Sequence, residues 1–171
     1  MEFRFETQYN AKTMTAMARA LRKTIRKKHS RRSHRLGWFV AVLAILFLFL
    51  RGPAFDVRTL VTAAAALVLV AALLFEDRLN GYIAQKRLLA GTERAVAVFT
   101  ETGFVSETDV GKTEWKYDRI ALLAETADFF VFIFSASHAQ LYDKRQLQGG
   151  TAEEFRRFIQ AATGKEIQAI G

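Results

Sequence analysis

The sequence predicts an α+β membrane protein, in which a two-helix transmembrane hairpin carries a small antiparallel β-meander closed by a C-terminal helix. Three observations lead to this prediction. Two uncharged apolar runs lie close together, at 36–50 and 59–75. From residue 93 the apolar side chains recur with a period of two, which is typical of strands. Residues 151–164 then have the pattern of a capped helix.

Charge and composition restrict the function further. The net charge of +8 comes from one arm, residues 19–35, which holds nine Lys and Arg and no acidic residue. The rest of the chain holds all 17 Asp and Glu and is close to neutral. The chain has no cysteine, which excludes disulfides, thiol catalysis and Cys-ligated metals.

We therefore divide the chain into four parts. Residues 1–35 form an N-terminal strand and a basic amphipathic helix, and 36–75 form the transmembrane hairpin. Residues 76–92 are a helical connector, and 93–171 are a cytoplasmic β-rich domain with a C-terminal helix. The hairpin loop RGPAFDVR is so short that the two helices must be antiparallel neighbours.

The apolar runs contain 15 and 17 residues, slightly fewer than the ~20 that span a bilayer. Trp38 lies where an interfacial aromatic is expected. A hairpin buried in a soluble domain is the alternative, and a cleaved signal peptide fits less well because the first run begins only at residue 36. The excess of Lys and Arg before the first helix places both termini in the cytoplasm of a multi-pass inner (plasma) membrane protein.

The basic arm is expected to bind anionic lipid headgroups, because each Lys or Arg near such a membrane contributes about 1 kcal/mol. Nucleic acid is not an expected partner, since the arm has no Phe, Tyr, Trp, Asn or Gln among its cations to stack on bases or read them. The residues expected at the membrane surface are Arg26, Lys27, Lys28, Arg31, Arg32 and Arg35.

The residue pattern of the N-terminal part predicts a strand over 2–7 and a helix that begins at Ala11, with Asn10 as its cap. Met14, Met17, Leu21 and Ile25 form a narrow apolar stripe on this helix. The stripe either packs on the cytoplasmic domain, which we favour, or lies among the lipid headgroups.

The residue pattern of the C-terminal part predicts about five strands and one helix. Gly91 is expected to end the connector helix, and strands over 94–100 and 104–110 form a hairpin. Further strands follow around 115–122, 129–134 and 138–144. Thr151 and Glu154 match a capping box, and Gly164 is a suitable C-terminal stop.

The order of these segments resembles the bacterial YcxB-like proteins. The matching stretches are 103–106, Trp115, 118–120, 129–134, 144–145 and 154–158. The family's aromatic–Trp motif is displaced here, so that Trp115 and Tyr117 flank Lys116, and Tyr142 and Asp143 replace the usual Ile-Pro. The resemblance implies an integral membrane protein whose tail is similar to a pleckstrin-homology-like barrel, and such barrels usually serve as recognition scaffolds.

Five side chains are candidates for a binding patch that takes a lipid headgroup or a partner peptide: Trp115, Tyr117, Arg119, Lys144 and Arg145. Two basic residues beside aromatics suit an acidic or phosphorylated group. The alternative is strand packing for the aromatics and ordinary surface charge for the cations.

We expect that this protein is not an enzyme and binds no cofactor. The GKT at 111–113 lacks the first glycine of a phosphate-binding loop, and no His or carboxylate pair has metal-ligand spacing. His138 lies near Ser135 and Ser137 in a turn, without the context of a nucleophile. The expected function is a membrane-anchored binding module for a membrane or protein partner. Alternatives are a structural subunit of a larger membrane complex and an unrecognised enzyme acting on lipid or protein; small residues in the second run also suit a homo-oligomer.

Overall fold

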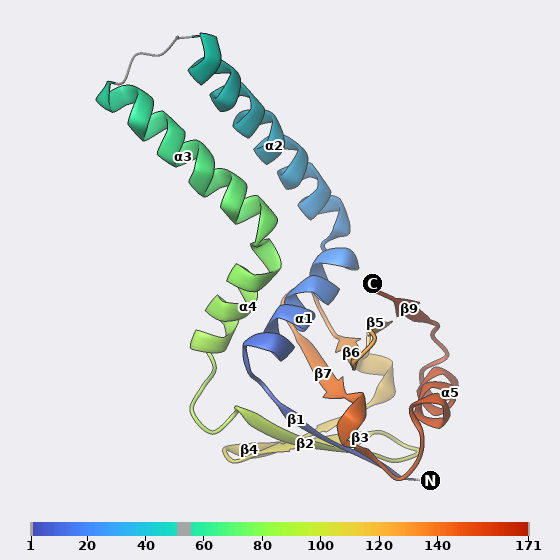
Figure 1. Ribbon diagram of the computed structural model, residues 1–171. Helices are drawn as coiled ribbons and strands as arrows, with labels where there is room; N and C mark the ends of the chain where they lie inside the picture. The colour runs from blue at the N-terminus through green and yellow to red at the C-terminus, as the bar shows by residue number, and fades with distance from the viewer. Residues whose placement is uncertain (1, 51–55, 171) are drawn as a thin grey trace.

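The computed structural model describes residues 2–50 and 56–170, and the chain has two parts, a helical stalk and an α+β domain (Figure 1). In the stalk, α2 (Lys27–Leu50) and α3 (Val57–Leu74) run antiparallel side by side. The predicted loop between them falls largely on residues 51–55, which lie outside the described residues.

Both stalk helices are long and apolar enough to cross a membrane. Only 6% of the residues in each apolar window are buried, so most of these side chains face outward. The two helices approach closely at small residues, because Ala41 and Ala66 are buried and a side chain at Gly37 would touch Leu73. Small residues at such a contact bring two backbones together.

The basic arm is divided between two helices. Helix α1 (Ala11–Lys23) begins at Asn10, whose side chain accepts hydrogen bonds from the backbone N–H groups of Lys12 and Thr13, as predicted. The chain then turns at residues 24–26, and α2 begins at Lys27. The second half of the arm is therefore continuous with the first apolar run.

The strands form two sheets, not one closed barrel, within the part of the chain that the structure describes. The first sheet has the order β4-β3-β2-β1-β8, and the second has the order β7-β6-β5-β9. The strands are β1 (Phe3–Gln8), β2 (Arg94–Phe99), β3 (Phe104–Thr108), β4 (Gly111–Trp115), β5 (Leu122–Glu125), β6 (Phe129–Ile133), β7 (Ala139–Asp143), β8 (Leu147–Gln148) and β9 (Ile167–Ala169).

Strand β1 pairs with β2 along its whole length, from Phe3 opposite Phe99 to Gln8 opposite Arg94. The N-terminal strand therefore belongs to the domain from which the stalk separates it in sequence. The expectation of about five strands after the stalk was too low, because eight follow it within the described residues. The strand expected around 115–122 does not form: β4 ends at Trp115, a 3-10 helix spans Tyr117–Arg119, and β5 begins at Leu122. Strands β8 and β9 have only two and three residues, and β9 pairs in parallel with β5, so neither had a pattern of its own.

The core lies between the two sheets and α5 (Ala152–Thr163), and phenylalanine rings dominate it. Phe5, Phe99 and Phe155 meet with centroid distances of 4.7–5.7 Å. The predicted capping box is present at the start of α5, and Gly164 ends the helix with φ +64°. Glycine adopts this left-handed conformation without the steric cost that other residues meet.

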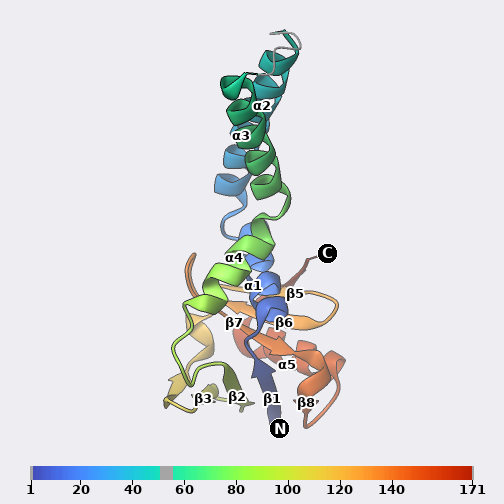
Figure 2. The same cartoon turned by 60° about the vertical axis from the view of Figure 1, so that its left-hand side comes forward.

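Helix α1 joins the stalk to the second sheet, and in both views it lies between the two parts (Figures 1 and 2). Met14 and Leu21 of its stripe are buried, and Leu21 packs with Val131 and Leu141, so the stripe packs on the domain. Ile25 lies beyond the end of α1 and is 40% exposed.

Helix α4 (Glu76–Lys86) continues below α3 and packs across α1. Gly81 permits this contact, because a Cβ at that position would lie 2.6 Å from the backbone nitrogen of Thr15. The prediction that Gly91 ends this helix was wrong. Arg87 is already the C-cap, and Gly91, with φ +85°, lies in the following loop.

Candidate functional site

The two aromatic residues of the predicted patch are packing residues. Trp115 at the end of β4 packs against Phe134, with the rings tilted and a centroid distance of 4.4 Å. Tyr117 is 6% exposed and donates its hydroxyl proton to the carbonyl oxygen of Thr100, at 2.6 Å. Burial raises the pKa of Tyr117. This tyrosine therefore remains a neutral donor that fixes the β2–β3 turn.

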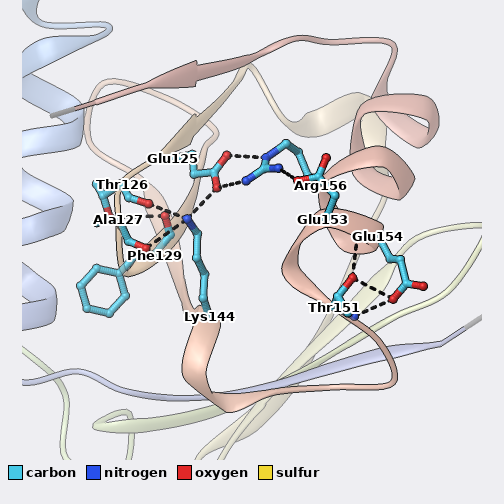
Figure 3. Close-up of polar contacts among 9 residues, drawn as sticks. All are labelled: Glu125, Thr126, Ala127, Phe129, Lys144, Thr151, Glu153, Glu154 and Arg156. Atoms are coloured by element: carbon cyan, nitrogen blue, oxygen red, sulfur yellow. Dashed lines mark hydrogen bonds and ion pairs between the residues drawn. The ribbon is translucent and has the colours of Figure 1, made fainter.

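Lys144 belongs to a polar cluster inside the domain (Figure 3). Its ammonium group lies 2.6 Å from Glu125 Oε1 and donates to the carbonyl oxygen of Thr126, also at 2.6 Å. Only 16% of the Lys144 side chain is exposed. The lysine therefore links the β7–β8 connection to the β5–β6 turn.

Arg156 of α5 completes this cluster. It donates two hydrogen bonds to the carboxylate of Glu125, from Nε at 2.8 Å and from Nη2 at 2.7 Å. Burial would raise the pKa of Glu125, but the hydrogen bonds from Arg156 and Lys144 outweigh it, so this pKa is lowered. The carboxylate therefore stays charged and ties β5 to α5 and to Lys144.

The remaining two candidates are more exposed. Arg145 pairs with Asp143 at 2.7 Å and lowers the pKa of that carboxyl group, and 64% of the Arg145 side chain is exposed. Arg119 is exposed on a short 3-10 helix, Tyr117–Arg119. Among the described residues, no hydrogen bond, ion pair or ring contact joins the aromatic pair to Lys144 or Arg145.

The concentrated positive charge lies instead at the elbow between α1 and α2. One cavity of about 530 Å³, which we call the elbow cavity, is lined by Arg22, Ser30, Arg31, His34, Arg35 and Trp38. A second cavity of about 370 Å³ shares three of these residues and extends to β9; it is lined by Arg22, Lys23, Thr24, Lys27, Ser30, Arg31, Gln168, Ala169 and Ile170. Neither lining includes an acidic residue.

Helical spacing brings the α2 residues to one face. Arg31, Arg35 and Trp38 are separated by four and three positions, so they follow one another along the helix surface. Arg22 reaches the same space from α1. Its Nε and Nη2 each lie 2.6 Å from a different carboxylate oxygen of Asp77, which fixes the guanidinium against α4.

Three of the six arm residues expected at a membrane surface line these cavities, namely Lys27, Arg31 and Arg35. Arg26 turns away and donates from Nε to the carbonyl oxygen of Ala136, at 2.8 Å. Lys28 and Arg32 are exposed and line neither cavity.

Sequence reasoning did not identify several lining residues, chiefly Arg22, Ser30 and His34. Arg22 lay within the basic stretch, and its spacing of nine positions from Arg31 gave no indication that the chain turns between them. The contribution of β9 had no signal, because it depends on pairing with β5.

Another cavity, of about 590 Å³, has both charges in its lining. It lies between α1 and the β5–β6 turn, where Lys12 pairs with Asp128 at 3.0 Å. No group of three or more His, Cys, Asp or Glu able to hold a metal ion occurs within residues 2–50 and 56–170.

Comparison with known proteins supports the resemblance seen in the sequence. Residues 99–159 match the family described as YcxB-like protein, and this segment extends from the end of β2 into α5. No curated protein matches the chain.

Proposed function

We propose that this chain is an integral protein of the bacterial inner membrane, in which α2 and α3 cross the bilayer and the α+β domain lies in the cytoplasm. The observation that carries the proposal is the pair of long helices with outward-facing apolar side chains. In a soluble protein such surfaces would be covered, because large exposed apolar areas promote association.

The distribution of charge supports the orientation. Nine Lys and Arg lie within residues 19–35, at the domain end of the stalk, whereas the loop and the start of α3 contain only Arg51 and Arg58. Cytoplasmic flanks carry the excess of Lys and Arg in membrane proteins. Both termini belong to the α+β domain, so one orientation places both in the cytoplasm.

The α+β domain is proposed to act as a non-enzymatic binding module for another membrane component or a protein partner. Strands β1–β4, then β5–β7, then α5 occur in the chain order of pleckstrin-homology-like domains, with the short strands β8 and β9 added on either side of α5. This order supports the assignment by analogy with a fold. The basic arm holds the module against anionic headgroups.

A specific observation favours the second candidate, a structural subunit of a larger membrane complex. Leu79, Tyr82 and Ile83 of α4 share one face and are each about half exposed, at 45%, 51% and 45%. Apolar side chains on one exposed helix face are typical of helices that bind in a hydrophobic groove of a partner protein.

Cysteine labelling tests the topology, because the natural chain has no cysteine. Val57→Cys, at the start of α3, should react with a membrane-impermeant thiol reagent in intact cells. Ala161→Cys, exposed on α5, should react only after permeabilisation. Labelling of position 161 in intact cells would refute the cytoplasmic placement of the domain.

Photo-crosslinking distinguishes the two candidate functions. A photoreactive residue at Arg145 should capture a discrete partner if the domain is a binding module. Capture at Tyr82 alone would support the structural subunit, and a crosslinked dimer of the chain would identify a homo-oligomer. No capture at either position would contradict both candidates.

A further inference from the structure

We propose that the elbow cavity binds a phosphate group, either of an anionic phospholipid or of a soluble phosphate ester. The lipid source rests on the membrane location proposed above. Such a site is more specific than a general attraction of the basic arm to a charged surface, because particular side chains form it.

Two arginine side chains at the elbow cavity are available to bind an anion. Arg31 and Arg35 line the cavity, and the guanidinium group of neither makes a hydrogen bond or an ion pair with any described residue. A guanidinium offers five N–H donors in a fixed planar arrangement that matches a phosphate group in bidentate geometry. Two such groups four positions apart on one helix can therefore approach a single anion together.

Ser30 adds a neutral donor between the two parts of the elbow. It is 9% exposed and lines both cavities, and its hydroxyl makes no hydrogen bond with the described residues. A hydroxyl in this position can donate to a phosphate oxygen, as Ser and Thr often do in anion sites. The site thus combines charge with a directed donor.

Arg22 lines the cavity with a guanidinium that is already held in place, and Asp77 offsets its charge. Its bidentate contact with Asp77 fixes the guanidinium, so little side-chain entropy remains to be lost when an anion binds. Two carboxylates contact the lining residues: Asp77 binds Arg22, and Glu76 Oε2 lies 2.5 Å from His34 Nε2 and 3.7 Å from Arg22 Nε. Glu76 is not among the lining residues.

The size and upper rim of the cavity favour a phospholipid. A volume of about 530 Å³ lies within the range of about 300–1,000 Å³ typical of small-ligand sites. Trp38 lies on the side toward the apolar part of α2 and is 42% exposed. An indole in this position can contact the glycerol and upper acyl region while the arginines hold the phosphate.

The test uses the full chain in neutral detergent micelles, where no charged surface attracts the arm as a whole. Native mass spectrometry would measure retention of phosphatidylglycerol, with phosphatidylcholine as the zwitterionic control. Glycerol 3-phosphate in a parallel titration represents the soluble source. We expect one tightly retained phosphatidylglycerol per chain.

The matched variants change the same charge in the same helix. Arg31→Ala with Arg35→Ala should weaken binding about tenfold or more, because each charge-assisted hydrogen bond is roughly twice as strong as a neutral one. Lys28→Ala with Arg32→Ala removes two cations that do not line the cavity and should change binding less than about threefold. Arg31→Lys with Arg35→Lys keeps the charge and should still lose affinity, because bidentate geometry is lost.

Each outcome either supports or overturns the proposed phosphate site. Retention of phosphatidylglycerol but not glycerol 3-phosphate supports the lipid source, and equal binding of both supports a soluble phosphate ester. Equal loss in the two double-alanine variants, or no retention of any phosphate compound, would overturn the site. The topology experiment is independent of this result, so failure of the cavity would leave the proposed membrane location intact.

Discussion

Glu125 is predicted to be a principal polar stabiliser of the α+β domain, and Glu125→Ala tests this. The carboxylate accepts two hydrogen bonds from Arg156 and lies 2.6 Å from Lys144 Nζ. Removing it leaves two cations without their common partner in a place where water reaches them poorly.

The magnitude follows from the exposure of the three groups. Breaking a fully buried ion pair costs about 3–5 kcal/mol, and an exposed pair contributes about 0–1 kcal/mol. The side chains of Glu125 and Lys144 are 13% and 16% exposed, and that of Arg156 is 31% exposed. We therefore expect Glu125→Ala to lower the free energy of unfolding by about 2–3 kcal/mol.

Glu153→Ala is the matched control. Glu153 also contacts Arg156, but its side chain is 62% exposed. Loss of this contact should cost less than about 0.5 kcal/mol, as for other exposed helix pairs.

Pulse proteolysis of the full chain in urea, in detergent micelles, measures both variants. The urea midpoint should fall by about 1–2 M for Glu125→Ala, for an m-value typical of small domains, and change little for Glu153→Ala. Equal losses in the two variants, or a loss below about 1 kcal/mol at Glu125, would refute the assignment of burial as the cause.

Two further predictions concern pH and helix packing. The folded-state pKa of Glu125 is lowered, so its stabilisation is present above the unfolded value of about 4.3 and is lost as the pH falls through the folded pKa. The difference in unfolding free energy between the natural chain and Glu125→Gln should therefore shrink below about pH 4.3 in acid titrations of stability; a constant difference would contradict the linkage. Gly81→Ala should destabilise the α1–α4 contact by about 1–2 kcal/mol net, because its Cβ would meet backbone atoms of Thr15 at 2.6–2.7 Å. Gly37→Ala, also within a helix, meets only side-chain atoms of Leu73, which can shift more easily than backbone, and should be neutral or slightly stabilising in the same thermal unfolding assay; similar losses at both glycines would argue against a backbone clash.

Local interactions made much of the fold predictable from sequence. The caps at Asn10 and Thr151 depend on side chains two or three positions from the groups that they satisfy, and Gly164 ends α5 through its own backbone conformation. The apolar runs are likewise defined by composition within one continuous segment. Such features need no knowledge of the rest of the chain.

The candidate site depended on contacts between distant segments. Lys144 looked like a surface cation, but its partners Glu125 and Arg156 come from another strand and another helix, and Tyr117 is buried by residues far from it in sequence. No periodicity reports which charges will meet.

The division between sequence and tertiary structure is clearest at the elbow. Sequence alone established that positive charge is concentrated before an apolar helix, because charge and hydropathy are properties of the residues themselves. Only the turn between α1 and α2, the fixation of Arg22 by Asp77 and the placement of β9 beside β5 gathered part of that charge around a cavity. Packing made this selection, because each of these contacts joins segments that are separated in the chain.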